Sequence, residues 1–168
     1  MKRVLVLGPS GSGTSTFSKK LADILQIPCI HMDLHYWKPH WVESTKEEWN
    51  EKVKELISRD KWVMDGNYST SLDMRLDRAD TAIFLDIPRW LSLFRILKRR
   101  IDYHGRVRPD LPEGCLEKMD FDFFKWVWNY PNRSRPVVLE LLTKHKSTTT
   151  VYQFASTTQA ESFLDSLD

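Results

Sequence analysis

Short runs of consecutive apolar residues alternate along the chain with longer segments in which apolar positions recur every three or four residues. The apolar runs predict five strands, at residues 4–7, 27–31, 61–65, 81–86 and 148–154. The periodic segments predict helices at residues 15–26, 46–58, 89–101 and 159–167. Strands that alternate with helices of this length form a parallel sheet with helices on both faces. We therefore expect a three-layer α/β domain whose sheet has about five strands.

Two of the expected helices begin with the spacing of a capping box. Thr45 and Glu48 have this spacing at the start of helix 46–58, and Thr158 and Glu161 repeat it before the last helix. In helix 89–101 the apolar residues fall at three- and four-residue steps, at Trp90, Leu93, Phe94, Leu97 and Ile101.

A glycine-rich stretch joins the first expected strand to the first expected helix. Residues 8–15 match the phosphate-binding pattern G-x-x-x-x-G-K-[ST] except at position 14. Glycines let the backbone turn tightly, so that several N–H groups and the positive end of the helix face one anion. The Ser15 hydroxyl stands where such loops ligate Mg²⁺. We expect nucleotide phosphates to be bound by Gly8, Pro9, Ser10, Gly11, Ser12, Gly13, Thr14, Ser15 and Thr16.

Position 14 departs from the pattern because it holds Thr in place of Lys. A Lys ammonium reaches the β- and γ-phosphates, whereas the Thr14 hydroxyl is too short to do so. A lost hydrogen bond to a charged group costs roughly 1.5–3 kcal/mol, and the transition state can lose more as its charge redistributes. We expect weakened nucleotide binding and strongly impaired transfer unless another cation substitutes. The alternative is a glycine-rich turn that binds no ligand.

Three carboxylates stand at or just after the ends of expected strands, namely Asp33, Asp65 and Asp86. Ligands of such sheets bind beyond the carboxyl ends of the strands, so all three are candidate site residues. Asp65 closes its strand and is expected to hold a metal-bound water or the Ser15 hydroxyl. The alternative is a turn residue, since Asp65-Gly66 favours a turn by itself.

The charge distribution adds a basic segment to this picture. The chain carries a net charge of +2, but residues 89–108 hold seven cations and one acid, which leaves −4 for the remainder. Such a block indicates an anion site rather than general affinity for nucleic acid, and its alternative is a solvated helix face. Residues 102–115 break the helical periodicity with Gly and Pro. We expect a basic lid over bound phosphates there, with an ordinary surface loop as the alternative.

Length and composition predict one domain that spans residues 1–168. Cys29 and Cys115 have no metal-binding or redox spacing, so a reduced, cytoplasmic protein is expected. The apolar run after Lys2 and Arg3 is too short for a signal peptide, and no stretch is apolar enough to span a bilayer. We expect no membrane partner, and the sequence leaves the oligomeric state open.

Together these segments resemble the adenylate-kinase-like P-loop phosphotransferases and, more narrowly, the bacterial DNA topology modulation proteins. The resemblance covers nearly the whole chain and rests on residues 8–16, 31–37, 62–68, 83–89 and 95–100. It implies a nucleoside-monophosphate-kinase type of scaffold that binds ATP and Mg²⁺ and moves the γ-phosphoryl group to a small acceptor. Thr14 is the departure, because it removes the family's catalytic lysine.

The resemblance also implies roles for single residues. Asp33 lies where related small-molecule kinases position the acceptor hydroxyl, so it is expected to be an acceptor ligand or general base. Arg95 and Arg99 lie four residues apart on one helix face, where they can grip phosphates. Arg133 and Arg135 are expected to close from the far side of the lid, and Asn67 and Arg75 to face an acceptor. The alternatives are a helix cap or loop hydrogen bond for Asp33, and pairing with surface acids such as Asp102 for Arg95 and Arg99.

An unusually aromatic segment at residues 121–130 predicts a buried helix, with an acceptor pocket wall or a protomer contact as alternatives. Three functions follow from the whole chain. The first is a phosphotransferase acting on a nucleotide and a small acceptor. The second is a nucleotide-binding regulatory protein without turnover, which Thr14 favours. The third is a DNA-binding protein, which only the basic block supports.

Overall fold

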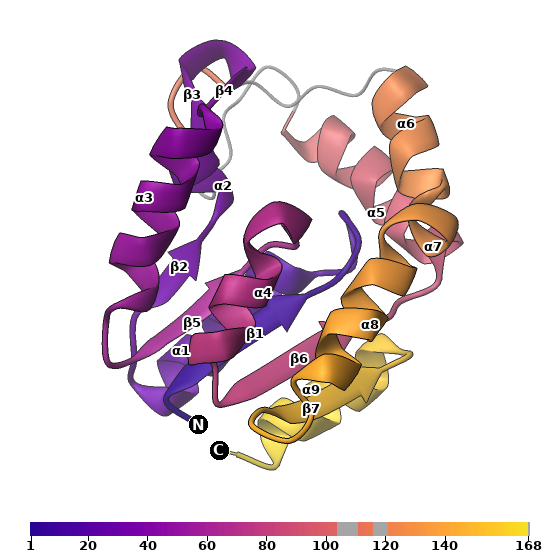
Figure 1. Cartoon of the computed structure of the whole chain (residues 1–168). Helices are drawn as coiled ribbons and strands as arrows, with labels where there is room; N and C mark the ends of the chain where they lie inside the picture. Colours follow the sequence, from indigo (N-terminus) through magenta and orange to yellow (C-terminus); the bar gives the residue numbers. More distant parts are fainter. Residues whose placement is uncertain (104–110, 116–120, 168) are drawn as a thin grey trace.

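A sheet of five parallel strands forms the centre of the computed structural model, in the order β2-β5-β1-β6-β7 (Figure 1). The structure describes residues 1–103, 111–115 and 121–167. The strands of this sheet are β1 (Arg3–Leu7), β2 (Cys29–His31), β5 (Trp62–Asp65), β6 (Thr81–Leu85) and β7 (Thr150–Phe154). β5 and β6 are buried along their whole length, as expected for parallel strands with helices on both faces.

The register of the sheet brings three chain segments to one edge. β1 pairs with β5 through Val6 and Asp65, and with β6 through Leu7 and Phe84. The three strands therefore end nearly level with one another. The residues that follow them, which include Gly8, meet at the carboxyl edge of the sheet, where ligands of open α/β sheets bind.

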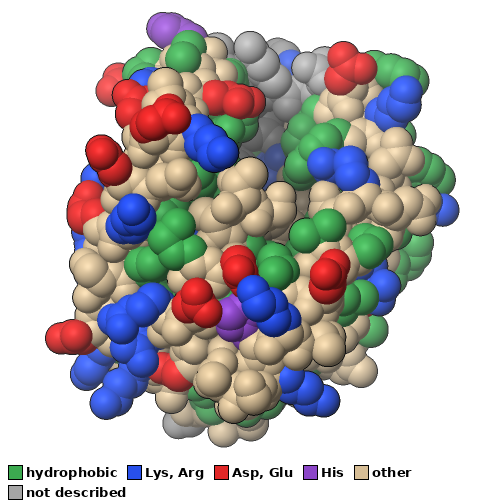
Figure 2. Space-filling view, in the orientation of Figure 1, with side chains coloured by type: hydrophobic (Ala, Val, Ile, Leu, Met, Phe, Trp, Pro, Cys, Tyr) green, Lys and Arg blue, Asp and Glu red, His purple; other side chains and the backbone are tan. Residues whose placement is uncertain are grey.

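Helices cover both faces of the sheet because successive side chains of β1 point to opposite sides. Val4 and Val6 pack with side chains of α1 (Thr14–Leu25) and α9 (Thr157–Asp165). Leu5 and Leu7 pack on the other face, which is covered by three helices. These are α3 (Lys46–Ile57), α4 (Ser69–Arg78) and α8 (Arg135–Lys144). Figure 2 views the molecule in the orientation of Figure 1 and shows acidic and basic side chains mixed over this surface.

The remaining elements stand beyond the carboxyl edge in two groups. One contains α2 (Asp33–Tyr36) and an antiparallel pair, β3 (Trp37–Lys38) and β4 (Val42–Glu43), joined by the 3₁₀ turn η1 (Pro39–Trp41). The other contains α5 (Arg89–Asp102), α6 (Phe121–Trp128) and α7 (Tyr130–Arg133). α5 and α6 pack through Leu93, Ile96 and Val127. In Figure 1 the two groups stand on opposite sides above the sheet.

The expected α/β fold is confirmed, with all five strands of the sheet and helices on both faces. The capping box of Thr45 and Glu48 is also confirmed, because each side chain bonds the other residue's backbone N–H. The last helix starts earlier than expected. Its N-cap is Ser156 rather than Thr158. The Ser156 hydroxyl accepts a hydrogen bond from the Gln159 N–H at 3.3 Å. The sequence pattern did not predict α4 or the short β3–β4 pair.

The aromatic segment at 121–130 is not the buried helix that its composition predicts. Only Val127 and Tyr130 are buried, whereas Phe121 is 78% exposed. α6 packs against α5 through one face, and two of its rings, those of Trp126 and Trp128, contact cations. The Arg89 guanidinium lies 4.0 Å from the Trp128 ring centre, and that of Arg133 lies 4.6 Å from the Trp126 ring centre.

The expected lid at 102–115 falls largely on residues 104–110, which lie outside the described residues. Its last part, residues 111–115, packs against β3 and η1. Cys115 is buried, and its thiol donates to the Lys38 carbonyl oxygen at 3.3 Å. Within the described chain, none of the helices has the length and apolar character needed to cross a bilayer.

Candidate nucleotide-binding site

The glycine-rich loop turns over the carboxyl end of β1 and runs into α1. Gly11 and Gly13 adopt φ values of 83° and 98°, in the left-handed region that glycine enters without strain. The Ser12 N–H closes a tight turn on the Pro9 carbonyl at 3.0 Å. At the start of α1 the amides of Thr14, Ser15 and Thr16 have no carbonyl one turn earlier inside the helix. These amides and the helix dipole make the loop suitable for an anion.

A second feature of the loop also fits a polar ligand. Ser12 is only 3% exposed, and its hydroxyl oxygen has no hydrogen-bond partner in the described structure. A buried hydroxyl without a partner costs free energy that a bound phosphate oxygen would recover. Ser15 is the second residue of α1 and lies partly exposed at its amino end. The loop residues expected to bind phosphates therefore form one continuous turn.

Thr14 is the first residue of α1 and supplies no charge to the loop. The cation of Arg95, from α5, contacts the loop instead. Its Nη1 donates to the Ser12 carbonyl oxygen at 3.0 Å, and its Nη2 donates to the Thr157 hydroxyl at 2.7 Å. Arg95 thus joins the loop, α5 and the start of α9. Its expected role as a phosphate ligand, and that of Arg99 one turn further along α5, stay predictions.

The beginning of the loop is held by Asn67, which follows β5. The Asn67 Oδ1 accepts from the Gly8 N–H at 3.1 Å, and its Nδ2 donates to the Gly8 carbonyl oxygen at 2.7 Å. Nδ2 also lies 3.4 Å from the Tyr130 hydroxyl oxygen. This pair of bonds satisfies both backbone groups of Gly8 and fixes where the loop leaves β1.

Asp65, the expected metal-binding carboxylate, closes β5 and is 4% exposed. Its Oδ2 lies 2.8 Å from Nδ1 of His31, whose Nε2 is in turn 3.7 Å from the Cys29 sulfur. The hydrogen bond with Asp65 raises the pKa of the His31 imidazole to about 10. Asp65 therefore faces a cationic neighbour on one oxygen, and its role toward a metal stays a prediction.

Asp33, the expected acceptor ligand, is the first residue of α2. Its Oδ1 accepts a short hydrogen bond from the Tyr68 hydroxyl. Burial and the neighbouring Asp33 carboxylate raise the pKa of Tyr68. The phenol therefore stays protonated and donates a hydrogen bond to Asp33. The rings of Tyr36 and Trp49 flank Tyr68, with centroids 4.7 and 4.8 Å from it. Asp33 consequently stands beside a cluster of aromatic rings, beyond the carboxyl edge of β2.

Arg75 is completely buried under this corner of the site. Its guanidinium donates to the carbonyl oxygens of Gly66, Asn67 and Tyr68, which follow β5. Burial lowers the pKa of Arg75 to about 10, because the charged form has lost its water. Arg75, which is expected from the sequence to face an acceptor, instead holds the segment that carries Asn67.

The third strand-end carboxylate, Asp86, is paired. Arg135 donates to it through Nε at 2.8 Å and through Nη2 at 2.7 Å, and Gln153 adds a third bond at 2.9 Å. A bidentate pair of this kind fixes the start of α8 against the end of β6. Arg133 lies two residues earlier, stacked on Trp126, and its expected catalytic role stays a prediction.

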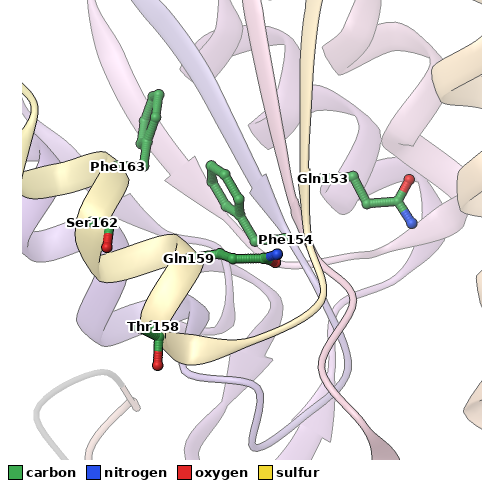
Figure 3. A pocket seen from close by; sticks show the side chains of 6 residues that line it. All are labelled: Gln153, Phe154, Thr158, Gln159, Ser162 and Phe163. Carbon is green, nitrogen blue, oxygen red and sulfur yellow. The ribbon is translucent and has the colours of Figure 1, made fainter.

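A shallow hollow elsewhere on the surface does not compete with the loop as a phosphate site. It lies between β7 and α9 (Figure 3), where Phe154 and Phe163 approach each other and Gln153 points away. Its lining is formed by Gln153, Phe154, Thr158, Gln159, Ser162 and Phe163. None of these residues is charged, so the hollow offers no cation to a polyphosphate.

The described side chains contain no cluster of three His, Cys, Asp or Glu residues able to hold a metal ion alone. The expected roles of Ser15 and Asp65 toward Mg²⁺ stay predictions. No local sequence pattern marks the contacts of Asn67 with Gly8, of His31 with Asp65 and of Arg135 with Asp86, so none of them is predictable from the sequence.

Comparison with known proteins supports the fold. No family model matches the chain. This chain is 27% identical over 146 residues to YqaC, an uncharacterized protein of Bacillus subtilis (strain 168). The match covers 86% of this chain and 81% of YqaC. The DNA topology modulation proteins are not among these findings, so that part of the resemblance stays a prediction.

Solved kinase structures match over almost the whole chain. Shikimate kinase from Acinetobacter baumannii, in complex with shikimate, superposes with a TM-score of 0.64 at 14% identity, covering 99% of this chain and 90% of that one. A gluconokinase from Sinorhizobium meliloti 1021 gives 0.53 at 18% identity, with 99% and 93% covered. Deoxyadenosine kinase from M. mycoides with bound dATP gives 0.52 at 12% identity, with 98% of both chains covered. The chain has the fold of the P-loop kinases.

Proposed function

We propose that this protein binds ATP with Mg²⁺ at the loop of residues 8–16 and transfers its γ-phosphoryl group to a small acceptor. The observation that carries the proposal is the loop itself. It combines two left-handed glycines, the open amides of α1 and an unpartnered Ser12 hydroxyl at the carboxyl edge of a parallel sheet. The kinase-like fold supports it further, since shikimate, gluconate and deoxyadenosine kinases share this architecture.

In this proposal each side chain has a stated task. The loop amides hold the phosphates, and Ser15 and Asp65 hold Mg²⁺, which neutralises charge on the phosphates when it is bound. Asp33, oriented by the hydrogen bond from the Tyr68 hydroxyl, accepts the proton of an acceptor hydroxyl. Arg95, Arg99 and Arg133 supply positive charge to the transferring group. Arg95 first has to leave the Ser12 carbonyl oxygen or donate from a second N–H.

Thr14 limits this activity. The backbone of the loop has the conformation that binds an anion, but the first residue of α1 has no ammonium group that could reach the β- and γ-phosphates. The ground state then lacks one charged hydrogen bond, roughly 1.5–3 kcal/mol, or about one to two orders of magnitude in affinity. We infer binding that is measurable but weak, and turnover that is low.

The second candidate is a nucleotide-binding regulatory protein without turnover. Two observations favour it: Thr14 stands in place of the lysine, and the guanidinium of Arg95 is already bonded to Ser12 and Thr157. A site of this kind still binds phosphates through backbone amides, which do not depend on residue 14. The two candidates differ only in whether transfer occurs.

The test combines calorimetric titration of ATP·Mg²⁺ with a phosphoryl-transfer assay over a panel of hydroxyl acceptors. Three proteins are compared: the parent chain, Thr14→Lys and Thr14→Gln, which has similar length without charge. We expect Thr14→Lys to bind ATP at least tenfold more tightly than the other two and to gain transfer. Binding that improves without transfer to any acceptor supports the regulatory candidate. Failure of all three proteins to bind ATP contradicts both candidates.

A further inference from the structure

The outer face of α5 carries a line of exposed large apolar side chains. Trp90 is 66% exposed, Phe94 62%, Leu97 42% and Ile101 77%. We call these four residues the outer seam of α5. The opposite face of the same helix is buried and packs through Ser92, Leu93 and Ile96. Soluble proteins rarely leave such a row of large apolar groups in water unless the row contacts another molecule.

The spacing of the seam identifies the shape of its partner. Its members lie four, three and four residues apart, which is the a/d spacing of a coiled-coil heptad. At about 100° per residue they fall within an arc of roughly 60° on the helix. A helix that lies on a membrane surface presents a wider apolar face, whereas a narrow line matches the seam between two helices.

The charges beside the seam identify the partner's chemistry. Lys98 is exposed on one flank, and Arg100 lies on the other. Two copies of α5 paired through this seam would bring cations against cations, which opposes self-association. Acidic residues on the partner would instead be attracted to both flanks.

We propose that the outer seam of α5 binds an amphipathic helix of another protein, with apolar residues at heptad a and d positions and acidic residues beside them. The four apolar side chains supply the buried contact, and Lys98 and Arg100 select the acidic flanks. This surface is separate from the face of α5 that holds the glycine-rich loop through Arg95. The proposal therefore holds whether or not the protein transfers phosphate.

The test uses the full chain and two synthetic helical peptides of three heptads, labelled with fluorescein. Both peptides carry Leu at the a and d positions; one has Glu and the other Lys at the flanking positions. Fluorescence anisotropy measures their affinities. We expect the Glu peptide to bind at least tenfold more tightly than the Lys peptide. The Lys98→Glu substitution is expected to reduce this preference at least threefold.

A double substitution, Phe94→Ser with Ile101→Ser, is expected to weaken binding of the Glu peptide at least tenfold. Val137 on α8 is similarly exposed, at 40%, so Val137→Ser is the matched control and is expected to change nothing. Circular dichroism establishes that each variant is folded. All the substituted side chains are exposed, so the fold is expected to be retained.

Three outcomes overturn the proposal. The first is equal affinity for the two peptides, or no loss of binding in the seam variant. The second is a dimer, detected by sedimentation, that dissociates in the seam variant and so assigns the seam to a second copy. The third is binding to vesicles of phosphatidylcholine with 30% phosphatidylserine, again lost in the seam variant, without binding of either peptide.

Discussion

At the scale of single residues, the site depends on side chains that hold the backbone rather than on side chains that point at a ligand. Asn67 satisfies both backbone groups of Gly8, and Arg75 satisfies three carbonyls of the segment that carries Asn67. These two residues form a chain of contacts from the buried core to the start of the loop. Changing either one alters the loop without touching a bound phosphate.

Asn67→Asp tests this chain of contacts. The substitution keeps an acceptor for the Gly8 N–H but places a carboxylate against the Gly8 carbonyl oxygen, which now lacks its donor. We expect a loss of roughly 1–3 kcal/mol in the free energy of unfolding, measured in urea, and at least tenfold weaker ATP binding. Asn67→Ala is the control, since it removes both bonds and adds no charge. Equal ATP affinity in the parent and Asn67→Asp would contradict the proposed position of the phosphates.

The paired imidazole of His31 predicts a pH dependence of stability. Asp65 raises the pKa of His31 from about 6.5 in the unfolded chain to about 10 in the folded one. Between these two pH values the folded state binds more protons than the unfolded chain. The contribution of the His31–Asp65 pair to the free energy of unfolding is therefore complete below pH 6.5 and is lost as the pH rises toward 10. His31→Gln keeps a neutral hydrogen-bond donor and lacks this titration.

The measurement is urea unfolding of the parent and of His31→Gln at several pH values between 6 and 10. We expect the parent to be more stable by roughly 1.5–3 kcal/mol at pH 6, the range for a hydrogen bond between charged groups. The difference between the two proteins is expected to shrink as the pH approaches 10. A difference that stays constant over this range would show that His31 is not protonated in the folded protein.

At the scale of elements, the glycine-rich loop is packed between α1 and α5. A Cβ added at Gly11 would lie 2.3 Å from the Ser92 carbonyl oxygen of α5, whereas one added at Gly13 would have its nearest neighbour, Arg95 Nη1, at 3.6 Å. Both glycines have positive φ. Alanine at Gly13 therefore tests backbone strain alone, whereas alanine at Gly11 tests the same strain together with crowding against α5.

We expect Gly13→Ala to cost roughly 1–2 kcal/mol of stability from left-handed strain alone. Gly11→Ala adds overpacking against α5, for a further loss of roughly 1–3 kcal/mol. Thermal and urea unfolding of both variants measures the difference. Equal losses in the two variants would mean that α5 yields easily, and that the contact between loop and helix is not rigid.

The elements show what the sequence allowed us to predict. The strands and the loop were predictable because their signals are local: a run of apolar residues, glycines at fixed spacing and a helix beyond. α4 was missed because only Leu72 and Leu76 give it a buried apolar stripe, too few for a period to emerge. Contacts such as Gly8 with Asn67 join residues 59 positions apart, and only the register of the sheet brings them together.

The misread aromatic helix has a related cause. Composition reports that residues 121–130 are apolar, but not whether another surface is present to cover them. α5 covers one face of α6, and the cations Arg89 and Arg133 contact the rings of Trp128 and Trp126. Cation stacking of this kind needs residues distant in sequence, and so has no periodicity to detect.

At the scale of the whole molecule, the charge distribution decides between a phosphate site and a surface for nucleic acid. Residues 89–108 carry +6 and the remainder −4. DNA affinity depends on how many cations face a row of phosphates at once. The cations of α5 point in different directions. Arg95 points inward to the Ser12 carbonyl oxygen, and the Arg89 guanidinium lies over the Trp128 ring. Arg106 and Arg108 lie outside the described residues.

From this arrangement we expect only weak, non-specific DNA binding at low salt, and none in a mobility-shift titration at 150 mM salt. Non-specific affinity falls by orders of magnitude over such a rise in ionic strength when it rests on several phosphate contacts. The comparison protein carries Arg99→Ala, Arg100→Ala and Arg106→Ala together. A shift that persists at 150 mM salt in the parent and disappears in the triple variant would favour the DNA-binding alternative. Competition by ATP would then show whether DNA and nucleotide share one site, because a polyphosphate held at the loop should displace only DNA that contacts the loop.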